Sequence, residues 1–322
     1  MADGPRGQGP VEAVGVDVGG TKVNALRVNV AGEILARSEK PTPANDAEAT
    51  LAALVEAARE ASGPQVAGVG VGAAGLVDRR TGLLTYAPNL VWRDADIPRV
   101  VEDALGLPAW VDNDCTAGGY GEWRLGAARG MSDVLYVGLG TGIGGGIVMN
   151  GQLCRGAVGF AGEIGHFIVE PDGYECGCGN RGCWETVASG TAITREGRAA
   201  ASRHAHSLIA ELAEGDPSQV TGALVTRAAY EGDPAARGIL AEVGTRLGEG
   251  IAGLVNILDP EVVVVGGGAA EAGELLLEPA RAAFARTVEG RPGRPHVPIV
   301  PAALGPDAAA IGAAFLVLDE HT

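Results

Sequence analysis

Three cysteines, at positions 176, 178 and 183, lie within a segment of eight residues, and glycines separate them. His166 comes ten residues before the first of these thiols. Three thiolates and one imidazole make a closed tetrahedral ligand set for Zn²⁺ that leaves no position for water, which is typical of a structural site. The sequence therefore predicts structural zinc held by His166, Cys176, Cys178 and Cys183. Uncoordinated thiols or a redox pair are the alternatives.

Two glycine-rich turns form a second group: DVGGTK at 17–22 and GLGTGIGGG at 138–146. Each presents backbone N–H groups and a hydroxyl where no Cβ obstructs a bulky anion, so each can bind phosphate. Either turn alone could be a β-hairpin that merely reverses the chain. Their occurrence as a matched pair, one with an acid and a lysine, favours phosphate binding.

Other glycine patterns exclude two classes of nucleotide site. The spacing GxGxxG occurs at 70–75 and at 140–145. The dinucleotide fingerprint requires a helix to begin inside this motif, and neither context provides one. No GxxxxGK[ST] motif occurs, so a Walker-type ATP site is excluded as well.

Several acids and amides have the chemistry to act on a polar substrate. The run Asp112–Asp114 ends a strand and precedes a helix, so a carboxylate there is either a general base or a helix cap. Glu163 and His166 are three apart, which places both on one helical face, although Glu163 could be a solvated acid. Asn89, after a proline, can donate and accept hydrogen bonds, and Glu185 follows the last cysteine.

The surrounding pattern predicts an α/β protein. Strand-like runs at 14–18 and 23–30 flank the first glycine turn, and 133–153 repeats this plan around the second. Thr21 precedes Gly32 by 11 residues and Thr141 precedes Gly151 by 10, which suggests a duplicated α/β unit with a ligand between the glycine turns. We also expect helices at 46–61, 97–106 and much of 186–257, strands at 66–73, 109–113 and 261–265, and an apolar helix at 308–318 that packs on the first domain.

Length and charge narrow the class further. The chain has 322 residues, enough for two domains with a ligand cleft between them. Its formal net charge is −16 and it has no Lys/Arg run, which excludes a nucleic-acid partner. No apolar stretch has the length of a membrane span and the first ten residues lack a signal-peptide pattern, so we expect a cytoplasmic protein.

The motifs DVGGTK, APN, ND, GLGTGIGGG, GEIGH, CGCGNRGCWE and VVVVGGG occur in this order from residue 17 to 268. In this arrangement the chain resembles the ROK sugar kinases, and the surroundings of APN are most similar to those of the bacterial glucokinases. The resemblance covers essentially the whole chain. One departure is Cys115-Thr116 after Asn113-Asp114, where the family usually has Ala-Asn.

The resemblance implies an actin-like (ribonuclease H-like), hexokinase-type fold of duplicated βββαβα units. We expect a small lobe of residues 1–112 plus 301–322 and a larger lobe of residues 113–300 that carries the zinc loop. The implied ligands are a hexose, ATP, Mg²⁺ and structural Zn²⁺, and a homo-oligomer, either a dimer or a tetramer, is expected.

The resemblance also implies a role for each matching residue. Asp114 would be the general base at the sugar 6-hydroxyl. The sugar would further contact Gly75, Asn89, Asn113, Asp114, Glu163, His166 and Glu185, with His166 serving zinc and sugar through different ring nitrogens. Asp17 would orient the magnesium shell, and the nucleotide would contact Gly19, Gly20, Thr21, Lys22, Gly140, Thr141, Gly142, Gly266, Gly267 and Gly268.

Three alternatives stay open. The first is a kinase for mannose, fructose or an N-acetylhexosamine. The second is a glucokinase that uses polyphosphate. The third is a non-catalytic, sugar-sensing transcriptional regulator, and against it stand the acidic composition and the 16 residues before Asp17, which are too few for a helix-turn-helix domain.

Overall fold

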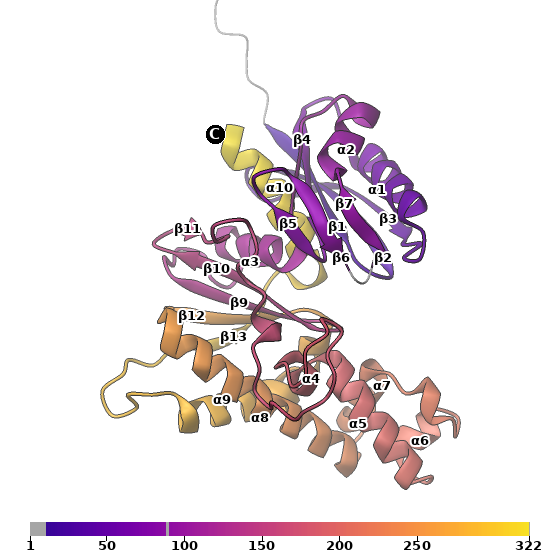
Figure 1. Cartoon of the computed structure of the whole chain (residues 1–322), viewed down its shortest axis with the longest axis vertical. Coiled ribbons are helices and arrows are strands. Elements are labelled where there is room, and N and C mark those ends of the chain that lie inside the picture. The colour runs from indigo at the N-terminus through magenta and orange to yellow at the C-terminus, as the bar shows by residue number, and fades with distance from the viewer. Residues whose placement is uncertain (1–10, 88–89, 322) are drawn as a thin grey trace, which may run out of the picture. The chain divides into compact units, whose positions relative to one another are not determined.

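The computed structural model describes residues 11–87 and 90–321, and the chain forms two compact units (Figure 1). Unit 1 comprises the residues through Gly130 together with Leu153–Ala161 and the segment from Pro306 onward. Unit 2 comprises Met131–Gln152 and Gly162–Gly305. Each unit has its own buried core of aliphatic residues.

Unit 1 is built on a five-stranded mixed sheet of order β3-β2-β1-β4-β8. β1, β2 and β3 are antiparallel neighbours, whereas β4 and β8 run parallel to β1. The apolar runs that predicted strands form the buried centre of this sheet, because both of its faces are covered. The strands are β1 (Glu12–Val18), β2 (Lys22–Asn29), β3 (Ile34–Pro41), β4 (Val66–Ala73) and β8 (Ala109–Asn113), and a separate sheet contains β5 (Leu76–Asp78), β6 (Leu83–Ala87) and β7 (Trp92–Ala95).

Four helices complete unit 1, and their ends carry the expected signals. Asp46 caps α1 by accepting hydrogen bonds from two N–H groups of the first turn. Asp96 caps α2, which ends at Gly106 in the left-handed conformation that favours glycine. The helices are α1 (Ala47–Ala61), α2 (Ile97–Leu105), α3 (Asp114–Arg124) and α10 (Ala308–His321).

Unit 2 repeats the plan of unit 1, with a five-stranded sheet of order β11-β10-β9-β12-β13. Here too the first strands are antiparallel and the later ones are parallel. The predicted fold class, a duplicated α/β unit, is therefore confirmed. The elements are β9 (Val134–Leu139), β10 (Ile143–Met149), β11 (Gln152–Leu153), β12 (Val262–Gly266), β13 (Ile299–Pro301), α4 (Glu185–Ala188), α5 (Gly190–Arg203), α6 (Leu208–Leu212), α7 (Gly222–Tyr230), α8 (Pro234–Leu258) and α9 (Glu274–Thr287), with short 3₁₀ turns η1 (Ile164–His166), η2 (Pro217–Gln219), η3 (Gly268–Ala272) and η4 (Gly305–Asp307).

The apolar tail forms α10, which packs on β1 and β4 of unit 1 as predicted (Figure 1). Its approach is close enough to require glycine in the sheet. A Cβ at Gly15 would collide with the carbonyl oxygen of Ala310, and one at Gly70 would collide with that of Ala313. The high glycine content of this chain therefore has a packing function in unit 1.

The expected lobe boundaries at residues 112 and 300 differ from the limits of the compact units. Unit 1 continues past residue 112 because α3 packs against α10, where Gly312 lies against the backbone of Ala117. The segment Leu153–Ala161 also belongs to unit 1. Among the described residues, no helix has both the length and the apolar character needed to cross a membrane.

The contact between α10 and β4 predicts a large cost for a single methyl group. Gly70→Ala is expected to lower the free energy of unfolding by about 1–3 kcal/mol or more, because the backbone of α10 cannot move away without disturbing the core. Gly253→Ala in α8 is the control, since a Cβ there meets no heavy atom within 4 Å. This control should be neutral or slightly stabilising, and denaturant unfolding measures both. Equal stability of the two variants would contradict the packing argument.

Candidate active site

Unit 1 brings together two of the predicted acids, Asp17 and Asp114. Asp17 on β1 pairs in register with Gly72 on β4, which in turn pairs with Asp112 on β8. A Cβ on Gly72 would lie 3.5 Å from the Cα of Asp114. Gly72 therefore lies next to both Asp17, its partner in the sheet, and the backbone of Asp114.

Burial raises the pKa of both acids, and repulsion by neighbouring acids adds to the shift at Asp17. Burial, followed by the negative charges of Asp114 and Asp307, raises the pKa of Asp17 to about 7, while the nearby Lys22 acts in the opposite direction. Burial also raises the pKa of Asp114, and the hydrogen bond from the Cys115 N–H opposes this shift. Two half-buried carboxyls with raised pKa values at one sheet edge are typical of a functional site.

Asn113, rather than Asp114, is the N-cap of α3. Its Oδ1 accepts a hydrogen bond of 3.0 Å from the Thr116 N–H, and its Nδ2 donates one of 3.2 Å to the carbonyl of Gly75. Gly75 has φ of +146°, and a Cβ there would collide with the carbonyl of Tyr86. The structure thus brings the predicted sugar-binding residues Gly75 and Asn113 together, and Asp114 is the first residue of the helix.

The first glycine turn connects β1 to β2. The Gly19 N–H donates to the Lys22 carbonyl over 3.0 Å, and Thr42 Oγ1 donates to the Gly19 carbonyl over 2.8 Å. Gly20 is exposed, and no heavy atom lies within 4 Å of an ideal Cβ built on it, so its backbone is open to a ligand. The ammonium of Lys22 lies 3.0 Å from Glu39, with which it forms an exposed ion pair.

Three residues beside these acids were missed by sequence reasoning. Arg37 binds both carboxylate oxygens of Asp307, at 2.8 and 2.6 Å, and this pairing lowers the pKa of Asp307. The buried Asn24 donates to the same carboxylate over 3.1 Å. Asp307 raises the pKa of Asp17 from a position nearly the whole chain away in sequence, so no local spacing could have revealed it.

Unit 2 contains the predicted metal ligands as one cluster. One ligand atom from each of His166, Cys176, Cys178 and Cys183 lies within 4.8 Å of the others. The Sγ atoms of Cys178 and Cys183 are 3.6 Å apart, and Cys176 Sγ lies 3.6 Å from His166 Nδ1. Tetrahedral zinc with sulfur ligands at about 2.3 Å requires sulfur separations of about 3.8 Å, so the cluster fits a zinc site.

Two acids flank the histidine of this cluster. Glu163 Oε2 lies 3.7 Å from His166 Nε2, and Glu185 Oε1 lies 3.6 Å from His166 Nδ1 and 2.9 Å from Cys176 Sγ. The other oxygen of Glu185 accepts a hydrogen bond of 3.2 Å from the Ile143 N–H. Glu185 therefore connects the cysteine loop to the second glycine turn.

The second glycine turn joins β9 to β10 and is held by several close backbone contacts. A Cβ on Gly142 would collide with the carboxylate of Glu185. At the start of α5, the Gly190 N–H donates to the Gly140 carbonyl over 3.0 Å. Gly267, with φ of +87°, lies so close that a Cβ would collide with the Leu139 carbonyl. The predicted phosphate turn and the predicted adenosine loop, Gly266–Gly268, thus adjoin one another.

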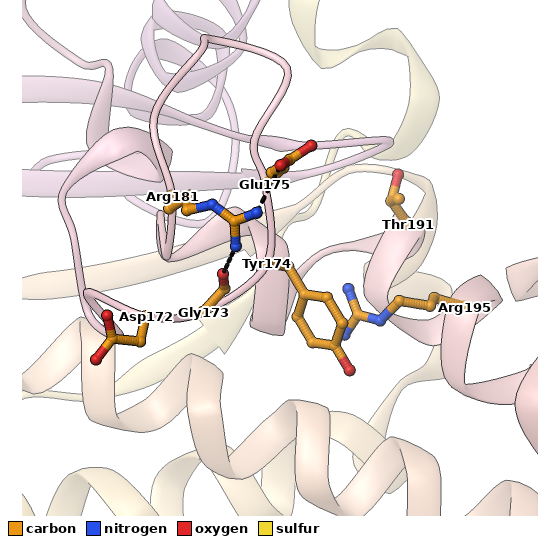
Figure 2. Close-up of a pocket in the computed structure, with 7 residues that line it drawn as sticks. All are labelled: Asp172, Gly173, Tyr174, Glu175, Arg181, Thr191 and Arg195. Atoms are coloured by element: carbon orange, nitrogen blue, oxygen red, sulfur yellow. Dashed lines mark hydrogen bonds and ion pairs between the residues drawn. The ribbon is translucent and has the colours of Figure 1, made fainter.

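A cavity of about 770 Å³ lies between the cysteine loop and α5 (Figure 2). The guanidinium of Arg195 stacks 3.6 Å from the ring centroid of Tyr174 and donates to the Thr186 carbonyl. Thr191 Oγ1 donates to the Thr141 carbonyl over 2.7 Å, which links this cavity to the second glycine turn. None of the lining residues was singled out in the sequence, because single arginines and threonines there form no recognisable motif. The lining residues are Asp172, Gly173, Tyr174, Glu175, Arg181, Thr191 and Arg195.

One predicted residue, Asn89, lies outside the described residues. The other predicted residues fall into two groups, one in each unit. Unit 1 carries Asp17, Gly19–Lys22, Gly75, Asn113 and Asp114, and unit 2 carries Gly140–Gly142, Glu163, His166, Cys176, Cys178, Cys183, Glu185 and Gly266–Gly268.

Known proteins share both the sequence and the fold. The chain is 39% identical over 306 residues to a glucokinase of Streptomyces coelicolor, covering 94% of this chain and 96% of that protein. The crystal structure of a ROK family glucokinase from Streptomyces griseus in complex with glucose and AMPPNP superposes with a TM-score of 0.89 at 40% identity, covering 96% of this chain and 99% of that one. A putative xylose repressor of Caldicellulosiruptor sp. is 33% identical over 285 residues, covering 83% of this chain and 68% of the repressor.

The profile of the ROK family matches residues 13–320, nearly the whole described chain. This match agrees with the order of the motifs and with the duplicated fold. The chain belongs to the ROK family, as its motifs predicted.

Proposed function

We propose that this protein is a cytoplasmic glucokinase that transfers the γ-phosphoryl group of ATP to the 6-hydroxyl of glucose. The proposal rests on Asp114, a half-buried carboxylate with a raised pKa at the start of α3, in a chain that also has two glycine turns suited to phosphate. Similarity to glucokinases at 39–40% identity, one of them solved with glucose and AMPPNP, supports the choice of sugar and donor.

Asp114 is the proposed general base. Its raised pKa makes the carboxylate a better acceptor for the proton that leaves the sugar hydroxyl. The hydrogen bond from the Cys115 N–H holds one carboxylate oxygen, and the cap at Asn113 sets the start of the helix. We propose that Asn113 also binds the sugar, together with Gly75, Asn89, Glu163, His166 and Glu185.

The two glycine turns are the proposed phosphate contacts. Gly19, Gly20, Thr21 and Lys22 belong to one turn and Gly140, Thr141 and Gly142 to the other, while Gly266–Gly268 would line the adenosine pocket. Phosphoryl transfer passes through a loose transition state, so positioning of the donor by such N–H groups supplies much of the rate. The carboxylate of Asp17 fits a Mg²⁺ shell. Burial raises its pKa most, and the negative charges of Asp114 and Asp307 add to the shift, so a divalent cation would stabilise the ionised form. When bound with ATP, Mg²⁺ supplies charge neutralisation on the phosphates.

The cysteine cluster is the proposed structural zinc site. His166 Nδ1 faces Cys176, and Nε2 faces Glu163, so one ring nitrogen is available for the metal and the other for a sugar hydroxyl. The loop also positions Glu185, two residues after Cys183. A homo-oligomeric state remains a prediction.

The experiment that tests the proposed function is a coupled ADP-release assay on purified protein. The sugar panel contains glucose, mannose, fructose and an N-acetylhexosamine, and polyphosphate is compared with ATP by direct detection of the sugar phosphate. We expect the highest kcat/KM with glucose and ATP. A protein that phosphorylates no hexose with either donor would refute the proposal.

Asp114→Ala is expected to lower kcat by about 10²–10⁴ or more while glucose binding, measured by calorimetry, is retained. The reason is that the carboxylate accepts the proton of the 6-hydroxyl, whereas Asn113 keeps its hydrogen bonds to Gly75 and Thr116. Glu56→Ala, at an exposed acid of the same unit, is the control and should keep wild-type turnover. Near-normal turnover of Asp114→Ala would remove Asp114 from the role of base.

Metal removal tests the cysteine cluster. Elemental analysis of wild-type protein should give about one zinc per chain, and Cys178→Ala should lose the metal, melt at a lower temperature and bind glucose more weakly. Cys154→Ala is the matched control, because Cys154 is exposed and outside the cluster. Active protein that contains no zinc would be incompatible with this site.

The raised pKa of Asp17 predicts a pH-dependent stability of the protein without nucleotide and Mg²⁺. An acid whose folded-state pKa is above its unfolded value contributes stability that is present below the unfolded pKa, and this is lost as pH rises through the folded pKa, here about 7. Asp17→Asn removes this ionisation. The melting temperature of the variant relative to wild type should therefore increase between about pH 5 and about pH 8. A difference that does not change with pH would contradict the shift.

A further inference from the structure

An ion pair between the buried Asp112 and the partly exposed Arg155 lies directly before the proposed base. Arg155 Nε donates to Asp112 Oδ2 over 2.6 Å, and Asp112 is 5% exposed. Asp112 is the penultimate residue of β8, whereas Arg155 comes from the segment Leu153–Ala161, which belongs to the same unit. Neither residue was assigned a role by the motifs of the family.

The carboxylate of Asp112 also contacts the backbone that leads to Asp114. Its Oδ1 accepts a hydrogen bond of 2.9 Å from the Asn113 N–H, and Asn113 then caps α3 through Thr116. Two residues further along, the Cys115 N–H donates a hydrogen bond to Oδ1 of Asp114. One carboxylate therefore joins the guanidinium of Arg155 to the backbone turn on which the proposed base sits.

Arg155 is itself held by an ordered loop. The Ala161 N–H donates to the Arg155 carbonyl over 3.1 Å, and the Arg79 N–H donates to the Val158 carbonyl over 3.0 Å. Gly159 has φ of +111°, and a Cβ there would collide with the carbonyl of Val77. The backbone that carries the Arg155 side chain is therefore held in place within unit 1.

Loss of the cation has a predictable local consequence. An ionised carboxylate that is buried without its partner is strongly unfavourable. The side chain of Asp112 would therefore turn toward solvent, or shift to bind a water molecule that enters the site. Either movement withdraws Oδ1 from the Asn113 N–H and loosens the turn between β8 and α3. The side chain of Asn113 keeps its separate bonds to Gly75 and Thr116, so the greater displacement is expected at Asp114.

We propose that Arg155 is a positioning residue for phosphoryl transfer, which acts through Asp112 to hold the backbone turn that orients Asp114. This inference rests on the proposed function, because it assigns Arg155 to a reaction in which Asp114 is the base. Misplacement of a catalytic group by about 1 Å can lower the rate by about 10²-fold, so the pair affects kcat more than sugar affinity.

The test compares Arg155→Met and Arg155→Lys with a matched ion pair elsewhere in unit 1. Arg27 pairs with the buried Glu12 over 3.4 Å, and both side chains have exposed fractions close to those of Arg155 and Asp112. Glu12 is at the opposite end of β1 from Asp17, so Arg27→Met is the control. Arg155→Met should lower kcat by about 10–100-fold and change the KM for glucose by less than about threefold. Arg155→Lys should recover much of the lost turnover, and Arg27→Met should keep wild-type kcat.

A second readout does not need kinase activity. Hydrogen–deuterium exchange of the peptide that covers residues 112–117, without substrate, should be faster in Arg155→Met, closer to wild type in Arg155→Lys and unchanged in Arg27→Met. If the wild-type protein phosphorylates no hexose, the proposed function fails and this exchange pattern alone decides whether Arg155 holds the turn. If Arg155→Met does not fold, the double variant Asp112→Asn/Arg155→Met replaces it and leaves no unpaired charge. It should show smaller changes in kcat and in exchange, in the same direction, because the turn loses its attachment to Arg155 but no buried charge drives it toward water. Wild-type kcat and wild-type exchange in the double variant would contradict the inference.

Three results would overturn the inference. One is wild-type kcat together with wild-type exchange in Arg155→Met. Another is a rise in the KM for glucose with unchanged kcat, which would assign Arg155 to binding. The third is a general loss of stability, indicated either by an equal loss of turnover in Arg27→Met or by a loss that Arg155→Lys does not reverse.

Discussion

The burial of two acids, Asp17 and Asp114, is the constraint on which the site of unit 1 depends. Gly72 pairs with Asp17 and lies beside the backbone of Asp114, and the negative charge of Asp114 adds to the pKa shift that burial causes at Asp17. Arg37 compensates Asp307 and Arg155 compensates Asp112, whereas Asp17 keeps a raised pKa. Arginines thus pair with the surrounding acids, Asp112 and Asp307. The central acids, Asp17 and Asp114, have raised pKa values, so they ionise only at a cost in free energy. This electrostatic state suits a base and a metal-bound triphosphate.

In unit 2, backbone contacts rather than charged side chains are the main constraint on the site. Its second glycine turn is held by the start of α5 and by Gly267, at contacts that no side chain could enter. Glu185 joins this turn to the cysteine cluster, so the cysteine loop and the second glycine turn share one carboxylate. Cross-linking by the proposed zinc would compensate for the scarcity of regular structure between Gly162 and Trp184, in a loop rich in glycine.

The same fold serves both kinases and regulators among the relatives of this chain, as the similarity to a xylose repressor illustrates. Fold therefore carries less functional information than the residues at the sheet edges. In unit 1 the acids lie near the end of β1 and directly after β8, and in unit 2 the corresponding region carries glycine directly after β9 and at the end of β12. A duplicated framework has thus acquired different chemistry in its two copies.

By itself the sequence determined most elements of the two main sheets, the duplication, the family and the four residues of the cysteine–histidine cluster, because each of these is encoded in short-range spacing. Strand periodicity, helix caps and the cysteine interval need only neighbouring residues, and the apolar segment at 308–318 could be recognised as a packed helix for the same reason. The candidate residues Asp17, Asn113, Asp114 and Glu185 came from motifs of this kind.

Only the tertiary structure determines which charged groups lie in contact. Asp307 reaches Asp17 after nearly the whole chain, and Arg155 reaches Asp112 across 43 positions. The same holds for Glu185 and the Ile143 N–H, which are 42 positions apart. Charge–charge interactions depend on distance in space and on burial, and neither quantity is encoded in the local pattern that makes a strand or a helix.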